Sequence, residues 1–159
     1  MNNLEKRVEA MMRLCVAENE KDRDQIRQEI RNYLAYAPNG NMDPEQEIRR
    51  ILLELGAPDH LVGHPYVIRG ILLVVGDRVY ISNITFGLYP QLAAEFDTTS
   101  ARVERAIRHL IEVTWARGDL DVLEKYFGNT ISASRGKPTN GEFIARIANV
   151  VKANMQKAA

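Results

Sequence analysis

Three arginines recur at every third position in the C-terminal half of the sequence. They are Arg102, Arg105 and Arg108, and Glu104 stands among them. On a helix such residues share one face, where like charges repel one another unless an anion binds. A guanidinium can bind phosphate or the edge of guanine, and a carboxylate can accept a hydrogen bond from cytosine. The pattern favours nucleic-acid recognition, although a solvent-exposed helix face also carries charges of this kind.

A helix over residues 99–117 separates these charges from an apolar face. Spacing of about 100° per residue places Val103, Ala106, Ile107, Leu110, Ile111, Val113 and Thr114 on one half. The three arginines share the other half with Glu104, His109 and Glu112. We expect His109 either to contact DNA or to pack as a partly exposed imidazole, and Trp115 to lie in the core.

The residues before this helix predict a shorter helix and a tight turn. The short helix is expected over Pro90–Phe96, and the polar turn over Asp97–Thr99, where Thr98 or Thr99 can cap the next helix. A short helix, a tight turn and a longer helix with base-reading side chains near its start make a helix-turn-helix. The second helix of that motif enters the major groove, so we predict double-stranded DNA as the partner.

Helical periodicity also dominates the rest of the chain, and we predict an all-α fold. Asp43-Pro44 is a strong helix start, and Thr139-Asn-Gly-Glu142 has the form of a capping box. The weak alternation at Arg78–Ser82 is too short to define a sheet. The other expected helices span residues 3–18, 22–36, 44–55, 65–76, 82–89, 119–126 and 139–151.

A linker at Ala37–Met42 divides the chain into two parts. Residues 1–42 are expected to form a helical hairpin with its linker, and residues 43–159 a helix-turn-helix domain. Two amphipathic helices cannot bury both apolar stripes alone. The hairpin is therefore expected either to pack on the domain or to pair with a second chain in a homodimer.

The composition excludes several classes of protein. The chain has 159 residues, of which 45% are hydrophobic and 26% charged, as in ordinary globular domains. With Cys15 as the single cysteine and scattered histidines, we expect no disulfide within the chain, no metal site and no cofactor. We find no nucleophile–base pair, carboxylate pair or glycine-rich phosphate loop, so we predict no catalytic residues and no enzyme. Without a long apolar run or a signal peptide, we expect a cytoplasmic protein with no membrane partner.

The net charge is zero, with 21 basic and 21 acidic residues, which by itself argues against a nucleic-acid partner. The charges are unevenly distributed, however. Residues 1–97 hold 11 Lys/Arg and 15 Asp/Glu, a net of −4, whereas residues 98–159 hold 10 and 6, a net of +4. This asymmetry either reflects chance or marks a basic face that docks on a polyanion.

Several motifs from about residue 43 to the C-terminus run in an order and spacing that resemble a known family. They are Leu88-Tyr-Pro90, Phe96-Asp-Thr-Thr99, Arg102-Val-Glu-Arg-Ala-Ile-Arg-His109, Ile111-Glu-Val113, Trp115-Ala-Arg-Gly118, Phe127-Gly128, Lys137-Pro-Thr-Asn140 and Glu142-Phe-Ile-Ala145. This stretch resembles the DNA-binding effector domain of the sporulation response regulator, stage-zero sporulation protein A, of endospore-forming bacteria.

The resemblance implies a six-helix, all-α domain that binds a short heptameric box, often as head-to-tail pairs on tandem boxes. It implies base reading by Glu104, Arg105 and Arg108. The residues expected to contact the DNA backbone are Thr99, Ser100, Arg102, His109 and Lys137. The stretch Gly118–Phe127 matches the family surface that touches the RNA polymerase sigma subunit, represented here by Asp119, Asp121, Glu124 and Lys125.

Three departures from the family pattern bear on function. Ser100-Ala101 stands in the reverse of the usual order, which removes one hydroxyl from the DNA-facing side. Val122-Leu-Glu-Lys125 replaces a more polar part of the sigma-contacting stretch. Residues 1–42 are too few to form the family's doubly wound receiver domain, so we expect no control by phosphorylation.

These observations predict a sequence-specific, DNA-binding transcription regulator of the sporulation type, which reads a short box with the helix over residues 99–117. The alternative is an interaction module that keeps the fold without binding DNA and antagonises the full-length regulator or a sigma factor.

Overall fold

The computed structural model describes residues 13, 23–24, 26, 42–128 and 136–158. The hairpin expected over residues 3–36 lies outside the described residues, apart from those single positions. The chain divides into two compact units, one comprising Met1–Asp43 with Ala158–Ala159 and the other Pro44–Lys157. The fold and the candidate site described below belong to the second unit.

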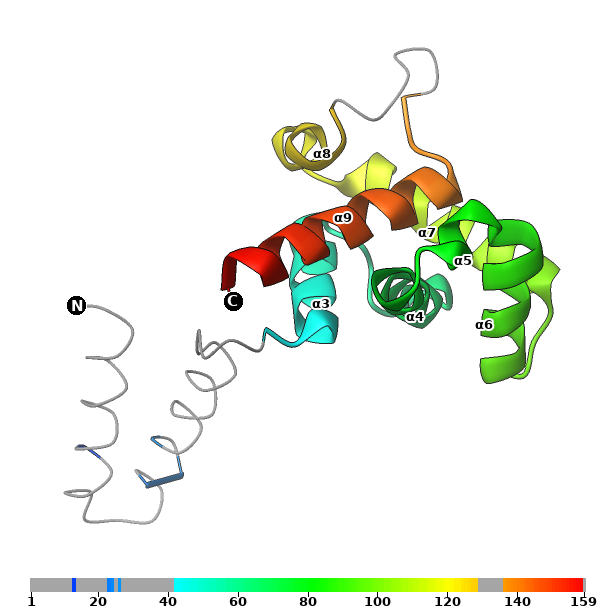
Figure 1. Ribbon diagram of the computed structural model, residues 1–159. Coiled ribbons are helices and arrows are strands. Elements are labelled where there is room, and N and C mark those ends of the chain that lie inside the picture. The colour runs from blue at the N-terminus through cyan, green and yellow to red at the C-terminus, as the bar shows by residue number, and fades with distance from the viewer. Residues whose placement is uncertain (1–12, 14–22, 25, 27–41, 129–135, 159) are drawn as a thin grey trace. The chain divides into compact units, whose positions relative to one another are not determined.

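Within the described part of the second unit, all regular elements are helices and there is no strand (Figure 1). The predicted all-α class is confirmed, and the expected count of six helices is approximate, because seven α-helices and one π-helix are present. They are α3 (Pro44–Glu54), α4 (Gly63–Gly76), α5 (Val79–Ser82), η1 (Ile84–Leu88), α6 (Tyr89–Glu95), α7 (Ser100–Arg117), α8 (Leu120–Phe127) and α9 (Asn140–Ala158). None of the helices in the described residues is long and apolar enough to cross a membrane.

Local sequence signals fix several helix ends. Helix α3 begins at Pro44 as predicted, and Gly56, with a φ of +76°, lies just beyond its end. The predicted capping box is confirmed at the start of α9. There the Thr139 Oγ1 accepts from the Glu142 amide at 3.2 Å, and Glu142 Oε2 accepts from the Thr139 amide at 2.8 Å.

The segment between α4 and α6 differs from the single helix expected over residues 82–89. Helix α5 ends at Ser82, and the π-helix η1 follows it. The Asp77 carboxylate accepts from the Val79 amide at 2.9 Å and so starts α5, while the Asn83 carbonyl accepts from the Gly87 and Leu88 amides at 2.8 and 3.4 Å. Hydrophobic periodicity cannot resolve helices of one turn, because they are shorter than the pattern that it detects.

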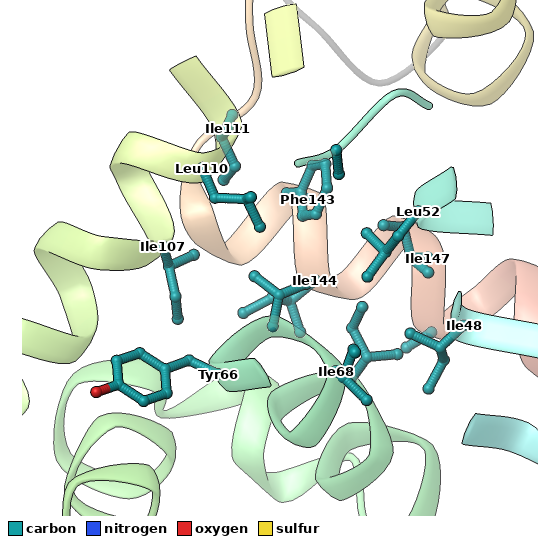
Figure 2. Close-up of a cluster of buried hydrophobic side chains, with 14 of the residues drawn as sticks. Ile48, Leu52, Tyr66, Ile68, Ile107, Leu110, Ile111, Phe143, Ile144 and Ile147 are labelled. Carbon is teal, nitrogen blue, oxygen red and sulfur yellow. The ribbon is translucent and has the colours of Figure 1, made fainter. Parts of the chain in front are cut away.

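The core of this unit is formed where α3, α4, α7 and α9 converge. Figure 2 shows Ile48 and Leu52 of α3 facing Ile144 and Ile147 of α9, with Tyr66 and Ile68 of α4 below them. Residues of α7 complete the cluster, among them Ile107, Leu110 and Ile111, which are at most 2% exposed. Burial of these large side chains is the main stabilising contribution to the domain.

The backbones of α4 and α7 approach closely at Gly63. A Cβ atom at this position would overlap the carbonyl oxygen of Ala106 and lie 2.7 Å from its carbonyl carbon. Real Cβ atoms do not approach backbone atoms so closely, so a larger residue at this position would displace one helix from the other. Gly63 therefore sets the distance at which α7 lies on the core.

Substitution of Gly63 tests this contact. We expect Gly63→Ala to lower the free energy of unfolding by about 1–3 kcal/mol, the usual cost of overpacking. The matched control is Gly76→Ala in the same helix, where an added Cβ meets no atom within 4 Å. Urea unfolding followed by circular dichroism measures both variants. Equal stability of the two variants would show that α4 and α7 are not held by this contact.

Candidate nucleic-acid interface

The predicted helix-turn-helix consists of α6, a four-residue turn and α7. Asp97 in the turn has a φ of +49°, a left-handed conformation that aspartate tolerates better than most residues. The Thr98 amide donates to the Ala93 carbonyl at 2.9 Å and closes the end of α6. The Thr99 Oγ1 accepts from the Arg102 amide at 3.3 Å, so Thr99 is the N-cap of α7, one of the two threonines predicted for this role.

The two faces of α7 are those that the sequence predicts. Five of the seven residues assigned to the apolar half are buried, and Ala106 and Val113 are partly buried. On the other half Arg102, Arg105, Arg108, His109 and Glu112 are exposed, and Glu104 is partly exposed. The exposed imidazole of His109 is therefore available to a ligand on this face, whereas Ser100 is partly buried at the helix start.

The charged residues on the exposed face differ in their partners. The Arg108 guanidinium pairs with the Glu104 carboxylate one turn earlier. Arg102 and Arg105 form no ion pair with any described residue. These two guanidiniums lie in the first two turns of α7, the part of a recognition helix that contacts base edges. The first turns of α7 thus present to solvent two positive charges that no described residue pairs.

Lys137 lies beside this face because the start of α9 packs against α7. Its Nζ donates to Glu112 Oε1 at 3.1 Å. The two residues line a pocket of about 430 Å³ together with Glu104 and Arg108. The remaining lining residues are Ile84, Tyr89, Ile111, Pro138, Thr139, Asn140 and Gly141. Lys137 is predicted to contact the DNA backbone. The structure places it in the same pocket lining as Glu104 and Arg108, two of the three predicted base-reading residues.

Asn140 connects three helices behind the exposed face, a role that the sequence does not reveal. Its Nδ2 donates to the Tyr89 hydroxyl of α6 and to the Glu104 carbonyl of α7, both at 3.0 Å. Asn140 is 9% exposed, and burial also raises the pKa of Tyr89. Both helices of the motif are thus fixed to α9 by one side chain, although nothing in the sequence indicates that Asn140 meets residues 36 and 51 positions away.

The far end of α7 is held by aromatic side chains. Trp115 contacts Phe127 of α8 and Phe143 of α9 edge to face, with centroid distances of 5.0 and 6.1 Å. Phe127 and Phe143 are stacked with centroids 5.4 Å apart. Trp115 is therefore a packing residue, as the sequence predicts.

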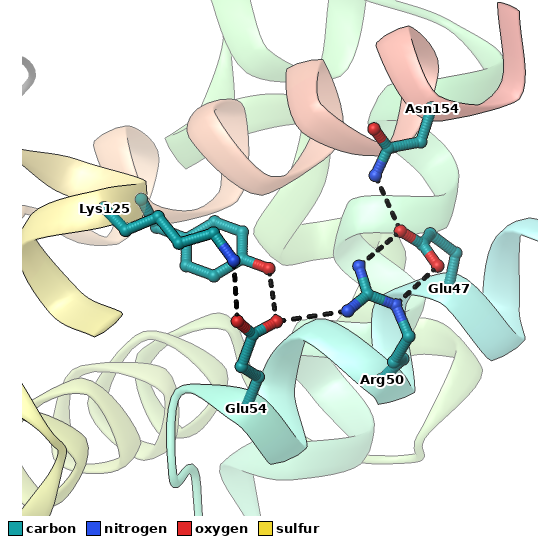
Figure 3. A network of polar contacts seen from close by, with 6 residues as sticks. Glu47, Arg50, Glu54, Lys125 and Asn154 are labelled. Atoms are coloured by element: carbon teal, nitrogen blue, oxygen red, sulfur yellow. Dashed lines mark hydrogen bonds and ion pairs between the residues drawn. The ribbon is translucent and has the colours of Figure 1, made fainter. Parts of the chain in front are cut away.

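The residues predicted to contact sigma lie in and just before α8. Asp119 caps this helix by accepting from the Asp121 amide at 2.8 Å, and Asp121 and Glu124 are exposed. Lys125 Nζ donates to the Glu54 carboxylate of α3 at 2.8 Å (Figure 3). Lys125 thus joins α8 to α3, a role that its position in the sequence does not reveal.

Glu54 belongs to a polar network that joins α3 to both α8 and α9 (Figure 3). Its carboxylate also accepts from the Tyr126 hydroxyl at 2.6 Å and from Arg50 at 3.1 Å. Arg50 in turn pairs with Glu47 at 2.8 Å, and Glu47 accepts from Asn154 of α9 at 2.7 Å. Hydrogen bonds from Lys125 and then Tyr126 lower the pKa of Glu54 to about 2, and the bond from Arg50 lowers that of Glu47.

A comparison with protein families identifies the same region of the chain. Residues 48–151 match the family described as the sporulation initiation factor Spo0A C terminal. The match begins within α3, includes α4 to α8 and ends within α9. It covers well over half of the 159 residues and contains the whole interface described above.

Removal of the Asn140 amide tests how the motif is held. Asn140→Ala leaves the buried Tyr89 hydroxyl without this donor, and we expect it to lower the free energy of unfolding by about 1–3 kcal/mol. Asn149→Ala, at an exposed position of the same helix, is the control and should change it by less than about 0.5 kcal/mol. Urea unfolding measures both, and equal effects would argue against a structural role for Asn140.

The lowered pKa of Glu54 predicts a pH-dependent stability. A carboxylate whose pKa is depressed on folding stabilises the protein above its unfolded pKa of about 4.5, and this contribution is lost as the pH falls towards 2. Glu54→Gln should therefore have a lower Tm than the wild type at pH 7, and the two Tm values should converge towards pH 2.

Thermal scans between pH 2 and 7 measure this convergence. Glu124→Gln is the control, because Glu124 is exposed on α8 and forms no ion pair with the described residues. A Tm difference between Glu54→Gln and wild type that stays constant from pH 7 to pH 2 would contradict the assignment.

Proposed function

Because the chain belongs to the family of the C-terminal, DNA-binding domain of the sporulation initiation factor Spo0A, we propose that it reads a short DNA sequence through the major groove with α7. The family is one of sporulation and transcription regulation. The observation that carries the proposal is the exposed face of α7, where Arg102 and Arg105 in the first two turns have no ion-pair partner among the described residues.

Each proposed contact follows from side-chain chemistry and from position on this face. Arg105 is exposed and has no ion-pair partner among the described residues, so its guanidinium can bind guanine in a bidentate manner. Glu104 can accept from the amino group of cytosine, and Arg108 can bind a base once it leaves Glu104. The backbone contacts are assigned to Thr99, Ser100, Arg102, His109 and Lys137. Such contacts fix orientation and affinity, and base contacts provide sequence specificity.

The exposed surface of α8 is the part of the domain that we propose to contact a protein partner. The exposed Asp121 and Glu124, together with Leu120, which is 79% exposed, are available to a protein partner, and we assign to them the contact with a polymerase sigma subunit. Asp119 and Lys125 border this surface while also holding α8 in place. We further propose that residues 43–159 are the DNA-binding domain, and that pairs form in tandem on DNA or through residues 1–42.

The proposal is tested first by selecting bound duplexes from a randomised pool and sequencing them. The pool should yield one enriched short box. In fluorescence anisotropy, Arg105→Ala should then bind this box with a loss of about 1–3 kcal/mol and should discriminate poorly at one base pair. The matched control is Arg117→Ala, an exposed arginine in the last turn of the same helix, which should bind almost as the wild type does.

Two results would reject DNA reading by α7. One is an equal affinity of the wild type for the box and for a scrambled duplex. The other is an equal loss of affinity in the Arg105 and Arg117 variants. A protein that shows no affinity for duplex at any salt concentration, but retains a sigma factor or the full-length regulator in a pull-down, would instead support the interaction module.

A further inference from the structure

Glu104, Arg108 and Glu112 follow one another at intervals of four residues along one stripe of α7. Each glutamate forms an ion pair: Glu104 pairs with Arg108, and Glu112 pairs with Lys137. All four side chains line the same pocket, so their charges cancel within a few ångströms. This stripe is therefore neutral, whereas Arg102 and Arg105 on the same face have no ion-pair partner among the described residues.

The two ion pairs arise in different ways. Arg108 and Glu104 are four residues apart on one helix, where such pairs form from local spacing alone. Lys137 lies 25 residues beyond Glu112, in the segment that leads into α9. The buried Pro138 and the hydrogen bonds of Asn140 to α6 and α7 fix this segment against α7. The pairing of Lys137 with Glu112 is thus a consequence of the tertiary fold.

Glu112 is also placed differently from Glu104 with respect to DNA. It lies two turns further along α7, about 12 Å at the usual rise per residue. In homeodomains, a helix-turn-helix variant, the C-terminal end of the helix that reads the major groove contacts the sugar–phosphate backbone. The Glu112 carboxylate lies beside the lysine that is proposed to bind phosphate, so a phosphate bound by Lys137 would meet its negative charge.

We infer that Glu112 limits the affinity of the protein for DNA of any sequence, because Lys137 must leave the Glu112 carboxylate to bind a phosphate and the carboxylate remains beside that phosphate. The inference rests on the proposed function. The side chains of Lys137 and Glu112 are nearly half exposed, at 46% and 45%. Exposed ion pairs are weak, so Lys137 readily exchanges the Glu112 carboxylate for a phosphate.

The physical consequence is a defined change in salt dependence. In the wild type the Glu112 carboxylate offsets the charge that Lys137 brings to its phosphate, so that phosphate keeps most of its counterion. Without the carboxylate, Lys137 neutralises the same phosphate and the counterion is released, which steepens the plot of log affinity against log salt by up to about 0.9. Phosphates carry no sequence information, so the selected box and a scrambled duplex should gain affinity equally. Glu112 thereby keeps sequence-independent binding low without taking part in base reading.

The test is an anisotropy titration of the 159-residue Glu112→Gln variant with a labelled scrambled duplex and with the selected box, over a series of salt concentrations. We expect severalfold tighter binding to both duplexes at low salt and a slope steeper by up to about 0.9. The matched control is Glu45→Gln on α3, which removes the same charge and frees Arg49 from an exposed ion pair outside the pocket. This control should keep the wild-type slope.

A double variant shows whether the effect requires Lys137. In a Lys137→Ala background, Glu112→Gln should no longer steepen the salt dependence, because the freed cation is missing. Circular dichroism at each salt concentration verifies that every variant is folded.

Unchanged or weaker binding by Glu112→Gln would overturn the inference, since it would show that the carboxylate merely holds Lys137 in position. An equal steepening in Glu45→Gln would also overturn it, because net charge alone would then explain the change. A wild-type protein that binds neither duplex at low salt rejects the proposed function, and the inference with it, so the two failures are distinguishable.

Discussion

The contact between Gly63 and the Ala106 carbonyl fixes how closely α7 lies on the core, and the exposed face of α7 depends on it. With no side chain at Gly63, the first turn of α4 meets the backbone of α7 directly. Asn140 then holds α7 to α6 and α9, and Trp115 holds its other end against α8 and α9. A helix fixed in this way can present the same side chains in the same geometry to each DNA site, as sequence reading requires.

The exposed face of α7 has a positively charged part and a neutral part. The first two turns carry guanidiniums without an ion-pair partner among the described residues, and the proposed function assigns to them both attraction to DNA and base contacts. The stripe further along the helix is neutral because each cation there has a carboxylate partner. Electrostatic attraction is strong but independent of sequence. A protein that must find one box among many other sites gains specificity when its phosphate contacts are limited and its base contacts are rigid.

The faces of α7, the Thr99 cap and the capping box at Thr139 could be predicted, because each depends on residues within one or two helical turns. The family resemblance identified the same stretch that the family comparison matches. The roles of Gly63, Asn140 and Glu54 could not be predicted, because each acts on a residue more than thirty positions away. Helix α5 was missed for a different reason, since a single turn is shorter than any hydrophobic period. η1 lies within the helix predicted over residues 82–89, but its π form could not be predicted. The base-reading residues remain a prediction that binding experiments must test.

The most direct test of DNA reading by α7 is a nuclear magnetic resonance titration of the labelled protein with the selected duplex. If α7 reads DNA, the largest shifts fall on the Arg105 and Arg108 side chains and on the backbone amides around Thr99 and Lys137. Amides of α3 and of the last turns of α9 should change little. Shifts confined to α3 or α8, with the first turns of α7 unaffected, would contradict DNA reading by α7.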